Sequence, residues 1–182
     1  MIYMFIANGF EEIEALCPLD LLRRADLEVK TVGIGGKEIC GSHGITVLTD
    51  IEDKEYSDPS PDMIILPGGM PGTTNLEASC TVNEAISTAV KNNAYIAAIC
   101  AAPMILGKKG LLNGKTAVCF PGFEEYLQGA TVLSDKGVAV DGRMITGAGM
   151  GAALEFGLAL VSAFKGEAYA SELRAKVIAD RA

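Results

Sequence analysis

The sequence has no tryptophan, one histidine and five cysteines that form no CxxC pair. The single histidine, His43, excludes a metal site built from several imidazoles, and the odd number of scattered cysteines argues against a zinc knuckle or a disulfide framework. We therefore expect no metal and a reducing, cytoplasmic environment. The longest apolar stretch, around residues 95–106, is shorter than the roughly 20 residues that a membrane-spanning helix needs.

Positive charge is also scarce, because 15 lysines and arginines face 23 acidic residues and leave a formal net charge of -8. No cluster of basic residues compensates for this excess, so a nucleic-acid partner is not expected. The 182 residues, of which 49% are hydrophobic, suit a single domain over residues 1–182 with a sizeable core. The first residues, MIYMFIA, lack a basic leader and are typical of a strand rather than a signal peptide.

Fully apolar runs at 2–7, 63–66 and 95–99 are typical of strands buried on both faces of a parallel sheet. Amphipathic helices are predicted between them, at 11–25 and 81–92, which gives the strand–helix–strand alternation of an α/β fold. The other predicted elements are a strand at 29–34, a hairpin from 38–40 and 45–48, a polar loop at 50–61, short strands at 131–133 and 138–140 joined by a turn, an apolar helix ending near 164 and a charged terminal helix at 165–182.

The stretch 95–106 places a cysteine on a strand-to-helix junction. Strand-like residues run to Ile99, and Cys100 opens a helical pattern without an intervening loop. A nucleophile at such a sharp turn needs small residues two positions before and after it, and Ala98 and Ala102 meet this need. The spacing therefore matches a nucleophile elbow. The alternative is a buried structural cysteine, since free cysteine is among the most buried residue types.

Two other segments are predicted to converge on this cysteine. In an open α/β sheet, ligands bind outside the carboxyl ends of the strands, where the segments that follow them meet. Gly68 and Gly69 follow an apolar strand and offer backbone N–H groups to the region of Cys100. Glu14 lies on the helix after the first strand and can point back toward the thiol. An acid, backbone donors and a nucleophile are thus expected together.

The neighbours of Glu14 have less specific roles. Glu11 and Glu12 are expected to stay solvated. Cys17 lies three residues after Glu14 on the same side of the helix, so it either lines the site or packs. The glycine-rich run 147–151 lacks the downstream βαβ unit of a dinucleotide site, so no cofactor is expected and close backbone packing near the site is favoured.

Nucleophilic attack by Cys100 calls for a lowered thiol pKa, because an unperturbed cysteine with a pKa of ~8.5 is mostly neutral at pH 7. Lowering the thiol pKa by about 3 units needs about 4 kcal/mol of stabilisation of the thiolate, which a helix N-terminus and backbone N–H donors can supply. A charged Glu14 beside the sulfur would oppose this shift, whereas a protonated Glu14 can donate a hydrogen bond to it. We therefore expect Glu14 to be neutral.

Four motifs follow one another along the chain: NGFEEIEALCPLD, IILPGG, AAICAAP and TGAGMGAALEFGLAL. Together they resemble the ThiJ/PfpI superfamily, in the branch of the parkinsonism-associated protein deglycase and its bacterial relatives, over nearly the whole chain. The resemblance implies a flavodoxin-like α/β sandwich, with a mostly parallel sheet and helices on both faces, and a homodimer. It also implies a nucleophilic Cys100, readily oxidised to sulfinate, beside a protonated Glu14, with backbone donors at Gly69 and Ala101.

The chain departs from this family pattern at two places and differs from another branch at a third. Phe120 stands where many relatives carry a histidine, so an acid/base role is unavailable there. His43 stands where close relatives have an arginine near the dimer interface, so it either approaches the site of a partner subunit or replaces a structural contact. The protease-like branch has a histidine directly after the cysteine, and Ala101 at this position disfavours a cysteine peptidase.

The predicted function is that of a glutathione-independent glyoxalase or deglycase that acts on methylglyoxal, glyoxal or early glycation adducts. Cys100 would attack the aldehyde, the N–H groups of Gly69 and Ala101 would hold the oxyanion, and Glu14 would relay protons. One alternative is a redox-sensing, chaperone-like stress protein in which oxidation of Cys100 to sulfinate is the functional event. Another is a catalytically silent, amidotransferase-like scaffold.

Overall fold

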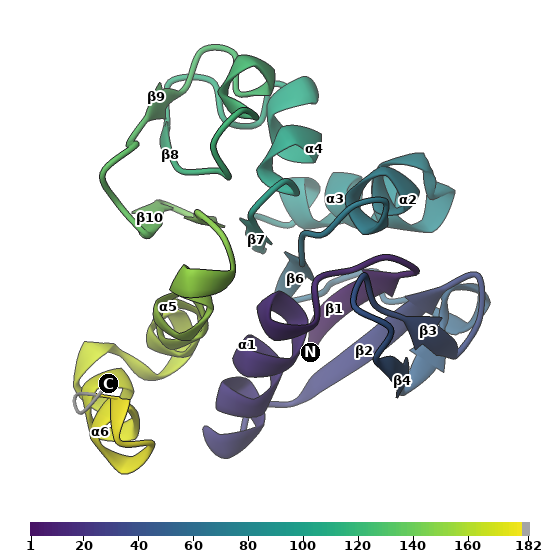
Figure 1. Cartoon of the computed structure of the whole chain (residues 1–182), viewed down its shortest axis with the longest axis horizontal. Helices are drawn as coiled ribbons and strands as arrows, with labels where there is room; N and C mark the ends of the chain where they lie inside the picture. Colours follow the sequence, from purple (N-terminus) through teal and green to yellow (C-terminus); the bar gives the residue numbers. More distant parts are fainter. Residues whose placement is uncertain (180–182) are drawn as a thin grey trace.

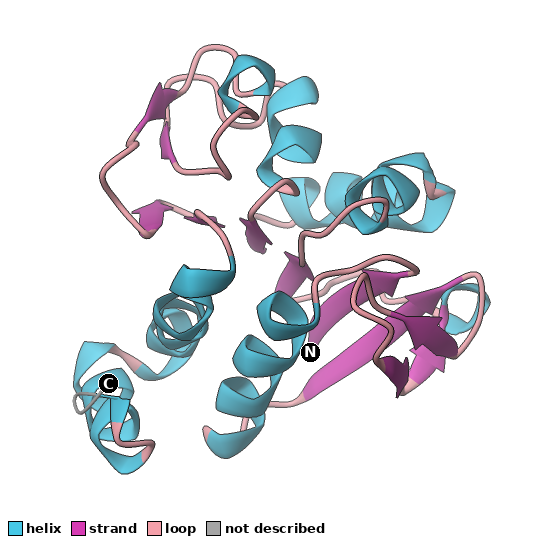
Figure 2. Cartoon of the chain, viewed as in Figure 1, coloured by secondary structure: helices cyan, strands magenta, loops and turns pink. Residues whose placement is uncertain are grey.

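The computed structural model describes residues 1–179, which form a sheet with helices on both faces (Figures 1 and 2). The seven strands of this sheet are β1 (Ile2–Ala7), β2 (Val29–Ile34), β5 (Ile51–Glu52), β6 (Met63–Leu66), β7 (Tyr95–Ile99), β10 (Val138–Asp141) and β11 (Met144–Gly147). They lie in the order β10-β11-β7-β6-β1-β2-β5, and every neighbouring pair is parallel except β10 with β11. The predicted α/β fold with a mostly parallel sheet is confirmed.

Within the described residues, six helices lie on the two sides of the sheet. One face carries α1 (Glu12–Arg24), α5 (Ala153–Lys165) and α6 (Glu167–Lys176), and the other carries α2 (Gly72–Ala78), α3 (Cys80–Lys91) and α4 (Pro103–Lys108), as Figure 1 shows. The alternation of side chains along each strand therefore fills two separate cores. In β1, Met4 points into the core beneath α1 and α5, and its neighbour Phe5 points into the core beneath α3 and α4. Within residues 1–179, none of these helices has the length and apolar character required to cross a bilayer.

The two cores meet at the end of β7. Ile99 belongs to the core on the α1 side, and Cys100 packs against that same core. Ala98 and Ala102 belong to the core on the α4 side. The chain thus passes from one face of the sheet to the other within a few residues of Cys100.

Smaller elements lie outside the main sheet. The predicted hairpin is confirmed as β3 (Glu38–Cys40) paired antiparallel with β4 (Thr46–Leu48). A second pair joins β8 (Thr116–Ala117) and β9 (Thr131–Val132) in parallel. The described residues also contain the 3-10 turns η1 (Asp53–Glu55), η2 (Glu124–Tyr126) and η3 (Met150–Ala152).

Of three local predictions, two are wrong and one is confirmed. The segment 50–61 is not a loop throughout, because it contains β5 and η1, and Ile51 extends the sheet beside Val32 of β2. The short strands predicted at 131–133 and 138–140 are confirmed as β9 and β10, which pair with β8 and β11 respectively. The terminal helix begins only after Gly166, whose φ of +85° ends α5, and it stops at Lys176; positions 180–182 of the predicted helix lie outside the described residues.

Candidate active site

Cys100 has the backbone of a nucleophile elbow. Its φ is +65°, in the left-handed region that a non-glycine residue adopts at a cost of about 1–3 kcal/mol. The turn is held from both sides, since the Cys100 N–H donates to Gly147 O at 2.9 Å and the Cys100 carbonyl accepts from Phe120 N–H at 2.8 Å. These bonds present the partly buried thiol at the carboxyl end of β7. A cysteine on a strained strand-to-helix turn is the backbone geometry that the sequence predicted.

Glu14 points from α1 to this thiol and is only 1% exposed. Its Oε2 accepts from Gly68 N–H at 3.1 Å, and its carboxyl group shares a hydrogen bond with Cys100. Burial, helped by the charge of Glu11, raises the pKa of Glu14 to about 7 despite these hydrogen bonds. Near neutral pH the neutral acid is therefore well populated, in the direction that the sequence argument required.

The prediction that the pKa of the Cys100 thiol is lowered is wrong when Glu14 is charged. Burial first, and then the neighbouring carboxylate, raise the pKa of the thiol to about 12, although N–H groups of Gly69 and Ala101 donate to the sulfur and lower it. The helix contributes little, since α4 has six residues and begins only at Pro103. When the proton moves from sulfur to Glu14, the repulsion disappears and the acid becomes a donor. The thiolate is therefore favoured only together with neutral Glu14.

The glycine pair after β6 fits tightly against Glu14, Cys100 and the backbone of Glu11. A side chain at Gly68 would overlap the Glu14 carboxyl and Cys100 Cβ, and Gly69 has a φ of +88° against the backbone of Glu11. The loop is tied down by hydrogen bonds from Glu11 N–H to Gly68 O at 2.9 Å and from Thr73 N–H to Gly69 O at 2.8 Å. The donor at Gly69 is thus held in place before any ligand arrives.

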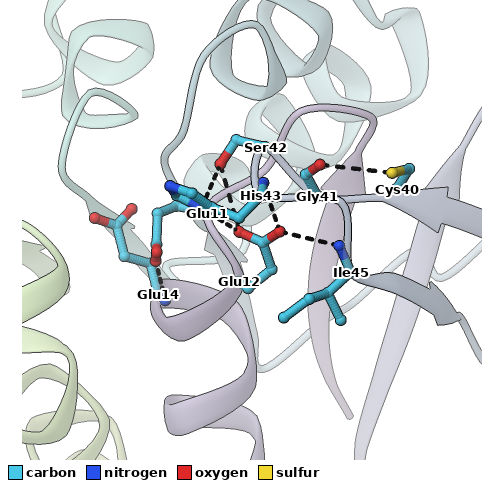
Figure 3. Close-up of polar contacts among 8 residues, drawn as sticks. All are labelled: Glu11, Glu12, Glu14, Cys40, Gly41, Ser42, His43 and Ile45. Atoms are coloured by element: carbon cyan, nitrogen blue, oxygen red, sulfur yellow. Dashed lines mark hydrogen bonds and ion pairs between the residues drawn. The ribbon is translucent and has the colours of Figure 1, made fainter.

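Glu12 lies on the same turn of α1 as Glu14 and makes a separate set of buried polar contacts (Figure 3). It is 2% exposed, and its carboxylate accepts from His43 N–H and Nδ1, both at 2.8 Å, and from Ser42 Oγ and Ile45 N–H, both at 3.4 Å. Burial alone would raise its pKa, but the hydrogen bonds from the His43 ring and backbone hold the pKa of Glu12 at about 2. The prediction that Glu12 is solvated is wrong, because the turn 41–45 folds over it.

We call this contact of Glu12 with Ser42, His43 and Ile45 the clasp. Figure 3 shows the Glu12 and Glu14 side chains leaving the helix in different directions. Ligand atoms of Glu11, Glu12 and His43 lie within 4.8 Å of one another. However, Glu11 Oε2 caps the helix by accepting from Glu14 N–H at 2.8 Å, and the Glu12 oxygens already receive four hydrogen bonds. The cluster is therefore explained by the clasp, and we assign no metal to it.

Of the two remaining predicted residues, Phe120 lies near the candidate site and Cys17 does not. Phe120 is 47% exposed, and its ring lies beside Gly149, which the Glu14 carboxyl also approaches. Cys17 instead lines a separate cavity of about 200 Å³ with Asp20, Arg24 and Leu154, among others. Burial raises the pKa of the Cys17 thiol. The structure thus brings Phe120 to the elbow and directs Cys17 elsewhere. The clasp was missed because no sequence pattern links Glu12 to the turn 41–45.

Comparisons with known proteins agree with this architecture. The DJ-1/PfpI family matches residues 1–163. Protein dj-1beta of Drosophila melanogaster is 32% identical over 172 residues, covering 93% of this chain and 92% of that protein. Its crystal structure has a TM-score of 0.92 at 30% identity, covering 97% of this chain and 96% of that one.

Two further relatives have names that bear on function. The glutathione-independent glyoxalase DJR-1.2 of Caenorhabditis elegans is 31% identical over 156 residues, covering 86% of this chain and 83% of that protein. Oxidized Toxoplasma gondii DJ-1 has a TM-score of 0.91 at 30% identity, covering 97% of each chain. The family match over most of the chain agrees with the four sequence motifs and with the fold, and the chain therefore belongs to the DJ-1/PfpI family.

Proposed function

We propose that the protein is a cysteine-dependent, glutathione-independent glyoxalase that converts methylglyoxal or glyoxal to the corresponding 2-hydroxy acid. The observation that carries the proposal is the buried carboxyl of Glu14 hydrogen-bonded to the Cys100 thiol, with N–H groups of Gly69 and Ala101 at the sulfur. Similarity to a relative named as a glutathione-independent glyoxalase supports the same reaction. Removal of early glycation adducts from proteins would use the same attack.

The first step is addition of Cys100 to the aldehyde. The sulfur forms a bond to the aldehyde carbon, the thiol proton leaves through Glu14, and the carbonyl oxygen takes up a proton to give a hemithioacetal. The N–H groups of Gly69 and Ala101 stabilise negative charge as it develops on that oxygen. Transfer of the thiol proton to Glu14 produces the neutral acid that favours the thiolate. The acid then gives this proton to the carbonyl oxygen, so Glu14 is a carboxylate again before the second step.

The second step is an internal oxidation and reduction. Glu14 removes the proton from the former aldehyde carbon and returns a proton to the ketone carbon, through an enediol, so that a thioester of the 2-hydroxy acid remains on Cys100. Water then cleaves the thioester, releases the acid and restores the thiol. The sum is one dicarbonyl and one water to one hydroxy acid, so no external electron acceptor enters the balance.

The direct test is lactate formation from methylglyoxal by the purified protein. We expect turnover by the wild type and its loss in Cys100→Ser and in Glu14→Gln, with the exposed substitution Glu84→Gln as the control. Absence of lactate with the wild type, or an equal rate with Cys100→Ser, would refute the proposal.

A second candidate is a redox sensor, favoured by the partly exposed elbow thiol with its acid partner and by similarity to a relative whose structure is of the oxidized protein. The Cys100 thiolate would reduce two molecules of hydrogen peroxide to water and become a sulfinate, with a chaperone-like response as the output. Intact-mass analysis after mild peroxide separates the candidates. A gain of two oxygens that is lost in Glu14→Leu, together with negligible aldehyde turnover, would favour the sensor.

We further propose a homodimer in a reducing cytoplasm. Support for the dimer comes from Ile45 of the clasp and from Ile13, which follows Glu12 in the sequence, because these two large apolar side chains are 53% and 48% exposed. Support for the compartment comes from the five free cysteines. Light scattering should give the mass of two chains for the wild type and of one for Ile45→Asp. A single-chain mass for the wild type would contradict the dimer.

A further inference from the structure

The backbone of Phe120 is hydrogen-bonded to the elbow at Cys100. Its N–H donates to the Cys100 carbonyl at 2.8 Å, so the residue keeps a fixed position relative to the nucleophile. Its ring is nevertheless 47% exposed to solvent. A phenylalanine that is anchored at its backbone but not buried at its ring offers an apolar face to whatever binds beside it.

The Phe120 ring and the Glu14 carboxyl group both lie near Gly149. Phe120 Cδ2 is 3.2 Å, and Glu14 Oε1 is 3.9 Å, from the point that a Cβ would occupy at Gly149. The missing side chain of Gly149 therefore leaves the edge of the ring and the carboxyl group facing the same small space. Because Glu14 is hydrogen-bonded to Cys100, this space adjoins the reacting atoms.

A second exposed apolar residue follows Gly149 directly in the sequence. This residue, Met150, is 55% exposed, so Phe120 and Met150 both present large apolar side chains to water. Covering such surface with an apolar ligand group is favourable, in proportion to the area that is removed from water. Aromatic rings gain further from edge-to-face or offset stacking on phenylalanine.

We propose that Phe120 sets the substrate class of this site, which is 2-oxoaldehydes with an aromatic or bulky apolar group on the ketone carbon. This inference rests on the proposed glyoxalase function. Bond making and breaking stay at the two carbonyl carbons, as described above, and the apolar group keeps its bonds throughout. Phe120 therefore contacts the substrate without exchanging protons or electrons with it, and the product from phenylglyoxal would be mandelate.

The test compares kcat/KM for glyoxal, methylglyoxal and phenylglyoxal, which carry hydrogen, methyl and phenyl on the ketone carbon. The variants are Phe120→Ala and Phe120→Tyr, both of which keep the N–H that binds Cys100. We expect the phenylglyoxal-to-glyoxal ratio to fall about tenfold in Phe120→Ala and to recover in Phe120→Tyr. Comparing ratios between variants cancels the intrinsic reactivities of the aldehydes.

A matched control is Val90→Ala, which truncates an apolar side chain of similar exposure, 45%, on the distant helix α3. This control should leave the ratio unchanged. A ratio in Phe120→Ala within twofold of the wild type would overturn the inference while leaving the glyoxalase function intact.

Failure of the proposed function gives a different result, namely no turnover of any of the three aldehydes by the wild type. The apolar subsite is then judged by protection of Cys100 from alkylation by iodoacetamide. We expect mandelate to protect the wild type at about tenfold lower concentration than lactate, and this difference to vanish in Phe120→Ala. Equal protection by mandelate and lactate in the wild type would overturn the inference on its own.

Discussion

Replacing Glu14 by glutamine should change how the stability of the protein depends on pH. The pKa of Glu14 is about 7 in the folded protein, against 4.5 for a free carboxyl group. The folded state therefore holds this proton more tightly, so the stabilisation is complete below pH 4.5 and is lost as the pH rises through 7. At about 1.4 kcal/mol for each unit of difference, the wild type should lose about 3 kcal/mol across this range through Glu14 alone.

Urea unfolding at intervals from pH 4.5 to 8.5 measures this loss. Glutamine keeps the size of the side chain and an oxygen for Gly68 N–H, but it has no proton to lose. The difference in unfolding free energy between Glu14→Gln and the wild type should therefore grow in favour of the variant with rising pH, and level off above pH 7. Glu84→Gln, which changes an exposed acid on α3, should follow the wild type. Parallel curves for Glu14→Gln and the wild type would refute a raised pKa at Glu14.

Three other substitutions test separate parts of the site. Glu12→Ala should lower the unfolding free energy by about 2 kcal/mol at pH 7, because the clasp donors lose a buried carboxylate; an unchanged urea midpoint would contradict this. Cys100→Gly should melt about 2–4 °C above Cys100→Ala, since glycine adopts a φ of +65° without strain. Equal melting temperatures of the two variants would exclude strain at the elbow. Gly68→Ala should slow alkylation of Cys100 by iodoacetamide by at least about tenfold, because the added methyl group overlaps the Glu14 carboxyl and Cys100 Cβ; an unchanged rate would show that the loop can move aside.

The central strands could be predicted because their composition leaves little choice. Apolar runs such as those at β1 and β6 are buried on both faces, and in water such runs have no other stable place. The short strands at the edge of the sheet and outside it were harder to predict. Ile51 forms only a two-residue strand beside β2, in a segment whose polar composition is typical of a loop. The pairing of β9 with β8 depends on contacts between distant segments, which local patterns do not encode.

The site was predictable to the extent that backbone chemistry determines it. Small flanking residues marked Cys100 as an elbow, and a glycine pair after a strand marked Gly68 and Gly69 as close neighbours of the site. Burial of Glu12 could not be inferred, because acids are mostly exposed unless a partner is folded over them. Here the partner is the turn at 41–45, and room for the carboxyl exists because Gly41 has no side chain in its way. The thiol pKa was mispredicted because the depth of burial at Cys100 is a property of the whole fold.

The crossing of the chain from one core to the other at Cys100 has a consequence for tolerance to mutation. Packed interiors pass on displacements, since they contain little empty space to absorb them. A change of volume beneath α5, for example at Phe156, reaches the elbow through Ile99, and a change beneath α4, for example at Leu106, reaches it through Ala102. The sulfur therefore responds to the packing of both halves of the molecule. Substitutions far from the site should thus alter its reactivity well before they unfold the chain.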